Sequence, residues 1–168
     1  MKKTLLLTMS LCLLLSACAT DYKGPLPDLN KKGPAAQEEF RQFYINDDFW
    51  DQAAFYQMGP NKEQYWLKSM EPVLEHVSPE SRARLEKAYK LQLASQILIW
   101  GAVAAIFLIP TQDDAQTKSQ LWGAYFVGFG GSVATGMMSA HERAEAAKIY
   151  NRDLKNKLIP DVNLTWSF

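Results

Sequence analysis

Two long helices are predicted by the pattern of apolar and polar residues in the second half of the chain. The first begins after Ser78, whose hydroxyl can cap it, with Pro79 in its first turn. No residue breaks this helix before Pro110. Charged residues spaced four apart mark its first part as solvated, and residues 97–109 are then continuously apolar.

A second helix is predicted from about Leu121 to Leu158, after a polar turn over residues 110–120. Its first half is uncharged and its second half is amphipathic. Because the turn is short, residues 78–158 are expected to form a long antiparallel hairpin. The apolar arms of this hairpin are residues 93–110 and 121–140.

The second helix carries a ridge of small side chains at every fourth position. The ridge consists of Ala124, Gly128, Ser132, Gly136 and Ala140, and it is continued by Ala144. Small residues let another helix approach closely, so that van der Waals contact can replace the hydrophobic drive that lipid does not supply. The pattern leaves open whether the partner is the first helix, a second copy of the chain or lipid.

Residues 35–77 are rich in aromatic side chains and are expected to form two or three short helices. Asn61 can cap a helix that presents Trp66 and Met70 on one face, and Pro72 would kink or restart it. The simplest interpretation of the aromatic residues is a small core. A ligand pocket is the alternative.

The final segment, residues 159–168, alternates between apolar and polar side chains once Pro160 has ended the second helix. This period of two predicts a short strand. Alternation up to a terminal Phe168 resembles the C-terminal signal of outer-membrane barrel proteins, but no other strand pattern precedes it. The predicted fold class is therefore all-α, with a strand that pairs with a partner's sheet edge or packs on the aromatic segment.

The first 17 residues follow another pattern, in which two lysines and a short apolar stretch lead into small residues and a cysteine. The apolar stretch has the length of a signal peptide and is too short to span a bilayer comfortably. The run Leu15-Ser16-Ala17-Cys18 resembles the lipobox of bacterial lipoproteins. The resemblance implies cleavage before Cys18 and acylation of that residue. A plain secretory signal and a membrane-anchoring helix are the alternatives.

Residues 18–34 are polar and rich in proline and glycine, which predicts a flexible tether between the lipid and the folded part. Two or more acyl chains on one cysteine form a stable anchor. In the lipoprotein family an aspartate after the cysteine commonly retains the protein in the inner membrane, and here Ala19 follows it. The resemblance therefore implies the periplasmic leaflet of the outer membrane.

Charge and cysteine content exclude several classes of function. Loss of Lys2 and Lys3 with the signal would leave 16 basic against 18 acidic residues, a net charge near −2, which does not suit nucleic-acid binding. Cys12 would leave with the signal and Cys18 would carry lipid. The mature chain is therefore expected to hold neither a disulfide nor a cysteine-based metal site.

No catalytic constellation is recognisable in the sequence. His76 and His141 are the only histidines, so the metalloprotease spacing of two histidines four apart is not met. Two pairs of acidic residues are adjacent in the chain, Asp47-Asp48 and Asp113-Asp114, and we interpret them as loop charges or helix caps. We expect no enzyme activity, no cofactor and no metal site.

Insertion of the hairpin into a membrane is favoured by its uncharged arms. The second arm is long enough to span a bilayer, whereas the continuous apolar run of the first measures only about 20 Å against a hydrocarbon core of ~30 Å. The turn holds Asp113, Asp114 and only Lys118, while both flanks carry basic residues, which opposes the positive-inside preference of an inner membrane. The hairpin is therefore expected in the outer membrane, or else buried in a protein assembly or in its own helical core.

These observations predict a non-enzymatic outer-membrane lipoprotein that acts as a structural or accessory component of an envelope complex. Its expected partners are membrane lipids and an envelope protein or further copies of itself. Two alternatives remain open. One is a membrane-active oligomer that forms a pore or perturbs the bilayer, and the other is a binder of a lipid or apolar ligand.

Overall fold

The computed structural model describes residues 20–47 and 55–160, and most of them are helical. The helices are α2 (Pro34–Phe43), α3 (Glu71–Val77), α4 (Pro79–Leu108) and α5 (Ala115–Leu158), and the strands are β1 (Phe55–Met58) and β2 (Glu63–Trp66). Short 3₁₀ segments at Leu67–Met70 and Ile109–Thr111 precede α3 and follow α4. The mainly helical class is confirmed, with a two-stranded sheet added to it. The predicted signal peptide, Cys18 and the strand beyond Pro160 lie outside the described residues.

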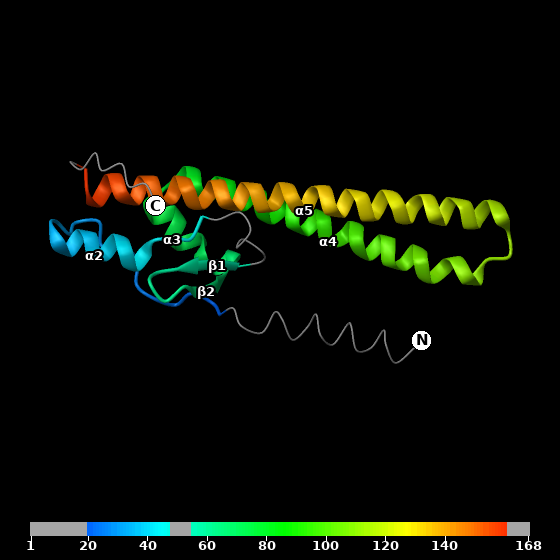
Figure 1. Ribbon diagram of the computed structural model, residues 1–168, viewed down its shortest axis with the longest axis horizontal. Helices are drawn as coiled ribbons and strands as arrows, with labels where there is room; N and C mark the ends of the chain where they lie inside the picture. Colours follow the sequence, from blue (N-terminus) through cyan, green and yellow to red (C-terminus); the bar gives the residue numbers. More distant parts are fainter. Residues whose placement is uncertain (1–19, 48–54, 161–168) are drawn as a thin grey trace.

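Helices α4 and α5 lie side by side and run in opposite directions (Figure 1). Ser78 caps α4 as expected, because its Oγ accepts a hydrogen bond from the backbone N of Ser81 (3.3 Å). With 44 residues, α5 is about 66 Å long. It begins at Ala115 rather than near Leu121, because the carboxylate of Asp114 accepts a hydrogen bond from Thr117 N at 2.7 Å and so caps the helix earlier.

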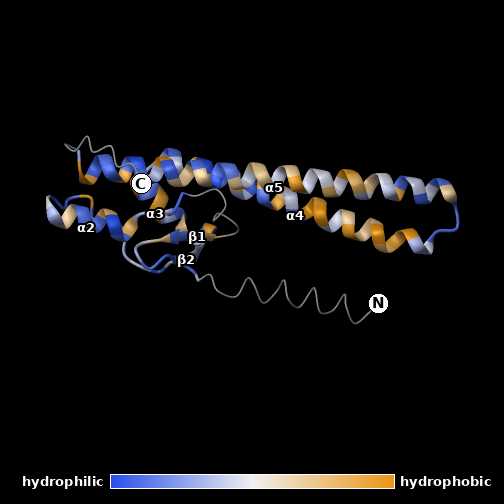
Figure 2. Cartoon of the chain, in the orientation of Figure 1, coloured by the Kyte–Doolittle hydropathy of each residue, from blue (hydrophilic) through white to orange (hydrophobic). Residues whose placement is uncertain are grey.

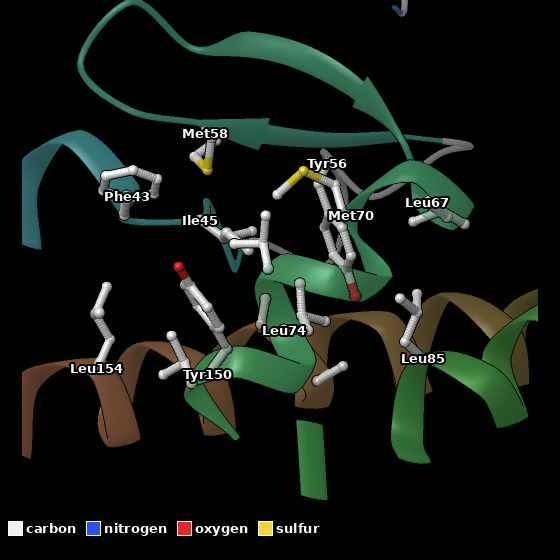
Figure 3. Packing of buried hydrophobic residues seen from close by; sticks show 14 of the residues in the cluster. Phe43, Ile45, Tyr56, Met58, Leu67, Met70, Leu74, Leu85, Tyr150 and Leu154 are labelled. Carbon is white, nitrogen blue, oxygen red and sulfur yellow. The ribbon is translucent and has the colours of Figure 1, made fainter. Parts of the chain in front are cut away.

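The remaining elements gather at one end of the helix pair (Figure 1). We call residues 93–140 the stem and the other described residues the head. The hydrophobic core lies in the head, where side chains from α2, β1, the Leu67–Met70 turn, α3, α4 and α5 meet (Figure 3). Its fully buried members include Ile45, Tyr56, Met70, Leu74, Tyr150 and Leu154. No stem residue belongs to this core cluster.

The chain after α2 is fastened to α5 by Asn151. Its Oδ1 accepts a hydrogen bond from Ile45 N (3.0 Å), and its Nδ2 donates one to Ile45 O (2.7 Å). Both groups are buried, so the amide replaces the partners that a neighbouring strand would supply. This clamp holds α2 and the start of the following segment against the last third of α5.

The predicted helix beginning at Asn61 is wrong. The structure instead has an antiparallel β-hairpin in which Phe55 pairs with Trp66 and Met58 with Glu63. Gly59 takes a positive φ of 73° in the turn, a conformation that glycine adopts without strain. On β1 the side chains alternate between half-buried and buried, which is the period of two of a strand that covers a core. Helix α3 begins only at Glu71, with Pro72 in its first turn.

The predicted flexible tether also differs from the structure. The backbone of Thr20 exchanges hydrogen bonds with β2, from Thr20 N to Gln64 O (3.0 Å) and from Trp66 N to Thr20 O (3.1 Å). Further along, Tyr22 N donates to Ser69 Oγ at 2.9 Å and Pro27 is buried. Proline and glycine therefore mark an irregular segment that packs on the head from residue 20 onward, because its polar backbone finds partners there.

Candidate functional site

The two stem helices approach each other closely at a glycine. A Cβ added at Gly128 would lie 3.0 Å from the backbone oxygen of Leu98 and 3.1 Å from the Cβ of Ala102. Ala102 and Ala105 are buried on the facing side of α4. Contacts this short leave no room for a side chain, so the small residues of both helices allow the approach.

Serine hydroxyls connect α4 and α5 at regular intervals. Hydrogen bonds run from Ser81 Oγ to Ala146 O (2.7 Å), from Ser139 Oγ to Ala88 O (2.8 Å) and from Ser95 Oγ to Ser132 O (2.9 Å). Each contact lies seven residues further along α4 and seven residues further back on α5 than the previous one. Seven residues are about two helical turns, so these bonds lie on one face and define the register of the two helices.

The predicted ridge lies only partly in this interface. Gly128 and Ser132 are buried against α4, and Gly136 is half-buried, with Ser95 Oγ 3.4 Å from an added Cβ. Ala124 is exposed and Ala140 is half-buried. A step of four residues advances about 40° around a helix, so five such positions cover about 160° and cannot all face one partner.

Ser139 and the serines of α4 are the interface residues that the ridge did not include. Ser139 is buried, with 1% of its surface exposed, whereas the neighbouring ridge residue, Ala140, is only half-buried. The signal that identifies it is the spacing of Ser132, Ser139 and Ala146 by seven, matched by Ser81, Ala88, Ser95 and Ala102 on α4. A seven-residue repeat follows one helix face more closely than a four-residue repeat.

Hydrophobic residues run along the stem, above all on α4 (Figure 2), and many of their large side chains are exposed, uncovered by any described part of the chain. The exposed fractions reach 74% at Val127, 66% at Ile97, 63% at Phe126 and 62% at Trp100. Further exposed apolar residues of the stem are Leu93, Ile106, Phe107, Leu108, Trp122, Phe129, Val133, Met137 and Met138. Clusters of exposed large apolar side chains mark interaction surfaces for proteins or membranes, so the outer faces of the stem are the candidate functional site.

Within the described parts of the chain, α4 together with the following 3₁₀ turn is the one helix long and apolar enough to cross a membrane. Only 11% of its most apolar window is buried inside the protein, so this segment is not a core helix. Helix α5 does not meet the same criterion. Its stem half holds glycine, serine and threonine, which lower its hydropathy while their hydroxyls bond within the helix pair or to their own helix.

Charged side chains begin abruptly where the stem joins the head. Glu142 is buried on α5 and accepts hydrogen bonds from Lys87 Nζ (2.5 Å) and Arg84 Nη1 (3.0 Å) of α4. These bonds, led by that from Lys87, lower the pKa of the Glu142 carboxyl. Lys90, further along α4, is paired with Glu86 at 2.8 Å. Next to Glu142, burial lowers the pKa of the Arg143 guanidinium.

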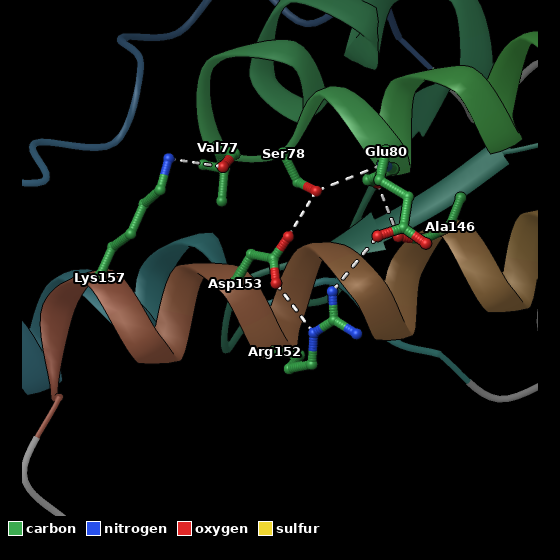
Figure 4. A network of polar contacts seen from close by, with 8 residues as sticks. Val77, Ser78, Glu80, Ala146, Arg152, Asp153 and Lys157 are labelled. Atoms are coloured by element: carbon green, nitrogen blue, oxygen red, sulfur yellow. Dashed lines mark hydrogen bonds and ion pairs between the residues drawn. The ribbon is translucent and has the colours of Figure 1, made fainter.

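A second polar network fastens the start of α4 to the end of α5 (Figure 4). Ser78 Oγ donates to Asp153 Oδ2 at 2.6 Å, and Lys157 Nζ donates to Val77 O at 2.7 Å. Burial raises the pKa of Asp153, but the hydrogen bonds from Arg152 and Ser78 outweigh it and leave that pKa lowered. These contacts hold the start of α4 against the end of α5 within the head.

His76, Asp47 and Asp114 make structural contacts, His141 and Asp113 are exposed, and Asp48 lies outside the described residues. His76 Nε2 lies 3.1 Å from Pro27 O, and His141 is exposed on α5. Asp47 accepts a hydrogen bond from Tyr44 OH, and Asp114 caps α5. Over residues 20–47 and 55–160, no group of three or more histidine, cysteine or acidic side chains is placed to hold a metal ion.

Comparison with protein-family models, with curated proteins and with solved structures finds no match to this chain.

Proposed function

We propose that this protein is a non-enzymatic lipoprotein of the outer membrane, and that its stem is an antiparallel hairpin inserted into the lipid as a second attachment beside acylated Cys18. The observation that carries the proposal is the contrast between a fully packed head and a stem whose outer faces are bare and apolar. In water these faces would be costly, at roughly 25 cal/mol for each Å² of apolar surface. In lipid they are at no disadvantage.

The dimensions of the stem support this placement. The exposed apolar residues extend from Leu93 to Leu108 on α4 and from Trp122 to Met138 on α5, which corresponds to about 24 Å and about 25 Å of helix. The apolar band of outer-membrane proteins is also about 25 Å tall, less than the ~30 Å of an average bilayer. Gln96, which is exposed on α4, would lie in the headgroup region near one end of this band.

The charges at the two ends of the stem favour the outer membrane. Residues 111–120 contain Asp113, Asp114 and one cation, Lys118, whereas basic residues cluster at the head end. If the head is periplasmic, an inner-membrane hairpin would place the acidic turn in the cytoplasm against the positive-inside preference. The outer membrane carries no such conflict, and Ala19 after Cys18 agrees with it.

A structural or accessory role in an envelope complex follows from what the proposed arrangement offers. Two attachments would fix the orientation of the head on the membrane surface, which a lipid anchor alone does not do. The partners would be membrane lipids and an envelope protein or further copies of the chain. A pore-forming oligomer is less well supported, because the exposed stem faces are apolar and a water-filled pore needs a polar lining. A ligand-binding role for the aromatic segment is also less well supported, because Phe43 and Tyr56 are part of the packed core.

The test separates the two attachments. In a Cys18→Ser variant exported with a plain, cleavable secretory signal in place of residues 1–17, the protein would keep its stem and carry no lipid, so it is expected to resist alkaline extraction from membrane fractions. Adding Ile97→Glu and Val127→Glu places two carboxylates on the most exposed apolar positions of the stem. Ile97 and Val127 lie about 6 Å and about 7.5 Å inside opposite ends of the apolar band. If the stem is in lipid, each carboxylate should cost less than the about 2.5–3.5 kcal/mol of the bilayer centre, and the two together should make the protein extractable.

A matched control keeps Cys18→Ser and adds Lys148→Glu, at an exposed position in the head. This variant should remain with the membrane. Extraction of the Cys18→Ser variant without any stem change would contradict insertion. Incorporation of labelled palmitate into the native protein but not into Cys18→Ser tests the lipidation itself.

A further inference from the structure

The described chain begins close to the junction of head and stem. Thr20 is hydrogen-bonded to β2, which pairs with β1, and Tyr56 of β1 donates a hydrogen bond to Arg143 O of α5 at 3.0 Å. Figure 1 shows the start of this chain beside β2, at the end of the head nearer to the stem. The N-terminal segment thus reaches the head at the level of Arg143.

Covalent geometry then limits where a lipid on Cys18 can lie. Cys18 precedes Thr20 by two residues, and extended chain covers at most about 3.6 Å per residue, so a lipid on Cys18 would be attached within about 7 Å of Thr20, which is fixed on the head. Along α5, Arg143 is five residues, or about 7.5 Å, from Met138, where the exposed apolar face ends. The acyl chains and the stem would therefore enter the membrane at nearly the same level.

At this level α4 carries cationic side chains beside the stem. Residues 84–90 of α4 and 141–143 of α5 contain four cations, Arg84, Lys87, Lys90 and the buried Arg143, against two carboxylates, Glu86 and Glu142. The Lys90 and Lys87 side chains keep 73% and 57% of their surfaces exposed although each makes an ion pair. The opposite end of the stem has one cation against two carboxylates. The positive excess is thus confined to the end that the anchor marks.

The surface there also changes from apolar to polar within one hollow of about 310 Å³. Met137 and Met138 line one part of it, and His141 and Glu142 line the other. A phospholipid changes from apolar to polar in the same order, from its acyl chains inside the bilayer to its phosphate at the bilayer surface. Lysines at such a boundary can lay the aliphatic part of their side chains along apolar surface and place their ammonium groups at the phosphates.

We propose that Lys87, Lys90 and His141, here called the basal ring, bind phospholipid phosphates of the same leaflet that holds the acyl chains of Cys18. This inference rests on the proposed insertion of the stem. The partner is the anionic headgroup of a bilayer lipid. The basal ring sets the depth at which the stem stops, and anionic phospholipids gather around it.

The test measures which lipid surrounds the stem. The full mature, acylated protein with Trp100 as its only tryptophan is reconstituted in phosphatidylcholine that contains brominated phosphatidylglycerol, or brominated phosphatidylcholine in a parallel sample. Bromine on the acyl chains quenches the exposed Trp100, and the ratio of the two quenching curves gives the preference for the anionic lipid. Lys90→Gln should lower this preference up to about fivefold, the effect of one basic side chain near an anionic surface.

Lys148→Gln is the matched control, because Lys148 is also exposed and makes one ion pair on its own helix, with Glu145 at 3.0 Å. It lies ten residues beyond Met138, about 15 Å from the proposed boundary and further than the ~10 Å screening length at 0.1 M salt. Its substitution should leave the preference unchanged. Circular-dichroism spectra and melting curves of both variants establish that they fold alike.

The outcomes separate the two proposals. Quenching by both lipids with a preference that Lys90→Gln does not reduce would overturn the basal ring and leave insertion standing. Equal losses in Lys90→Gln and Lys148→Gln would also overturn it, since the effect would then be one of net charge. Absence of quenching by either lipid would overturn insertion and the basal ring together.

Discussion

The close approach of the stem helices can be tested with two glycines on the same helix. A methyl group added at Gly128 would meet the backbone oxygen of Leu98 at 3.0 Å and the Ala102 methyl at 3.1 Å, and neither can turn away. A methyl group added at Gly130 would meet nothing within 4 Å. Alanine at either position gains about 1 kcal/mol in helix propensity, so this contribution cancels when the two variants are compared.

The expected difference follows from the crowding at one site. Gly130→Ala should raise the free energy of unfolding by about 1 kcal/mol. Gly128→Ala must force the helices apart, and such overpacking costs about 1–3 kcal/mol, so it should be the less stable variant by that amount. At about 2–4 °C for each kcal/mol in a chain of this size, thermal unfolding followed by circular dichroism resolves the gap. Equal melting temperatures, or a more stable Gly128→Ala, would refute the close packing of α4 on α5.

Three further substitutions test the contacts that hold the molecule together. Ser139→Ala removes a buried hydroxyl that bonds to α4 and should cost about 1 kcal/mol in a melting experiment, whereas Ser119→Ala, at an exposed position of α5, should cost almost nothing. Asn151→Leu leaves two buried backbone groups without partners and should cost about 2–5 kcal/mol in denaturant unfolding; a cost no greater than that of the exposed Asn156→Leu would argue against the clamp. The lowered pKa of Glu142 means that its carboxylate stabilises the fold above its unfolded pKa near 4.5, and this contribution is lost as the pH falls through the folded value. Glu142→Gln should therefore flatten the acid limb of the stability profile below about pH 4.5, and an unchanged acid limb would count against the pairing.

The sequence predicts the long helices well because their signals are local. Ser78 before Pro79 marks the start of α4. No proline follows within the helix, which continues to Leu108. The start of α5 was placed too late because residues after Asp114 are polar. Polarity indicated a turn, but the carboxylate of Asp114 accepts from the first helical turn and so begins the helix there.

The head was harder to predict, because its structure depends on partners far away in the chain. The segment from Asn61 offers apolar residues at helical spacing, and only β1 on its other side shows that it pairs as a strand. The four residues from Gly59 to Lys62 between two stretches rich in aromatic side chains were the available hairpin signal. Likewise, proline and glycine in residues 20–33 do not reveal that β2 and α2 receive this segment.

The small-residue pattern shows how a correct observation can be read at the wrong period. Spacing by four selected Gly128 and Ser132, which face α4, but also Ala124, which does not. Spacing by seven on both helices selects the serine contacts. This spacing can be recognised only when the sequences of the two helices are aligned in opposite directions. The uncovered faces of the stem were anticipated as apolar arms, and their exposure follows from the small interface, since it leaves the large side chains pointing outward.

The most direct test of the account is the accessibility of single cysteines in cells, in a chain whose own cysteines are expected to be removed with the signal or acylated. Val127→Cys lies on the bare face of the stem, and Lys148→Cys lies on the head. We expect an impermeant maleimide, added after the outer membrane is permeabilised, to label position 148 and to leave position 127 unlabelled until detergent dissolves the lipid. Labelling of position 127 to the same extent as position 148 before detergent is added would place the stem in water and contradict the account.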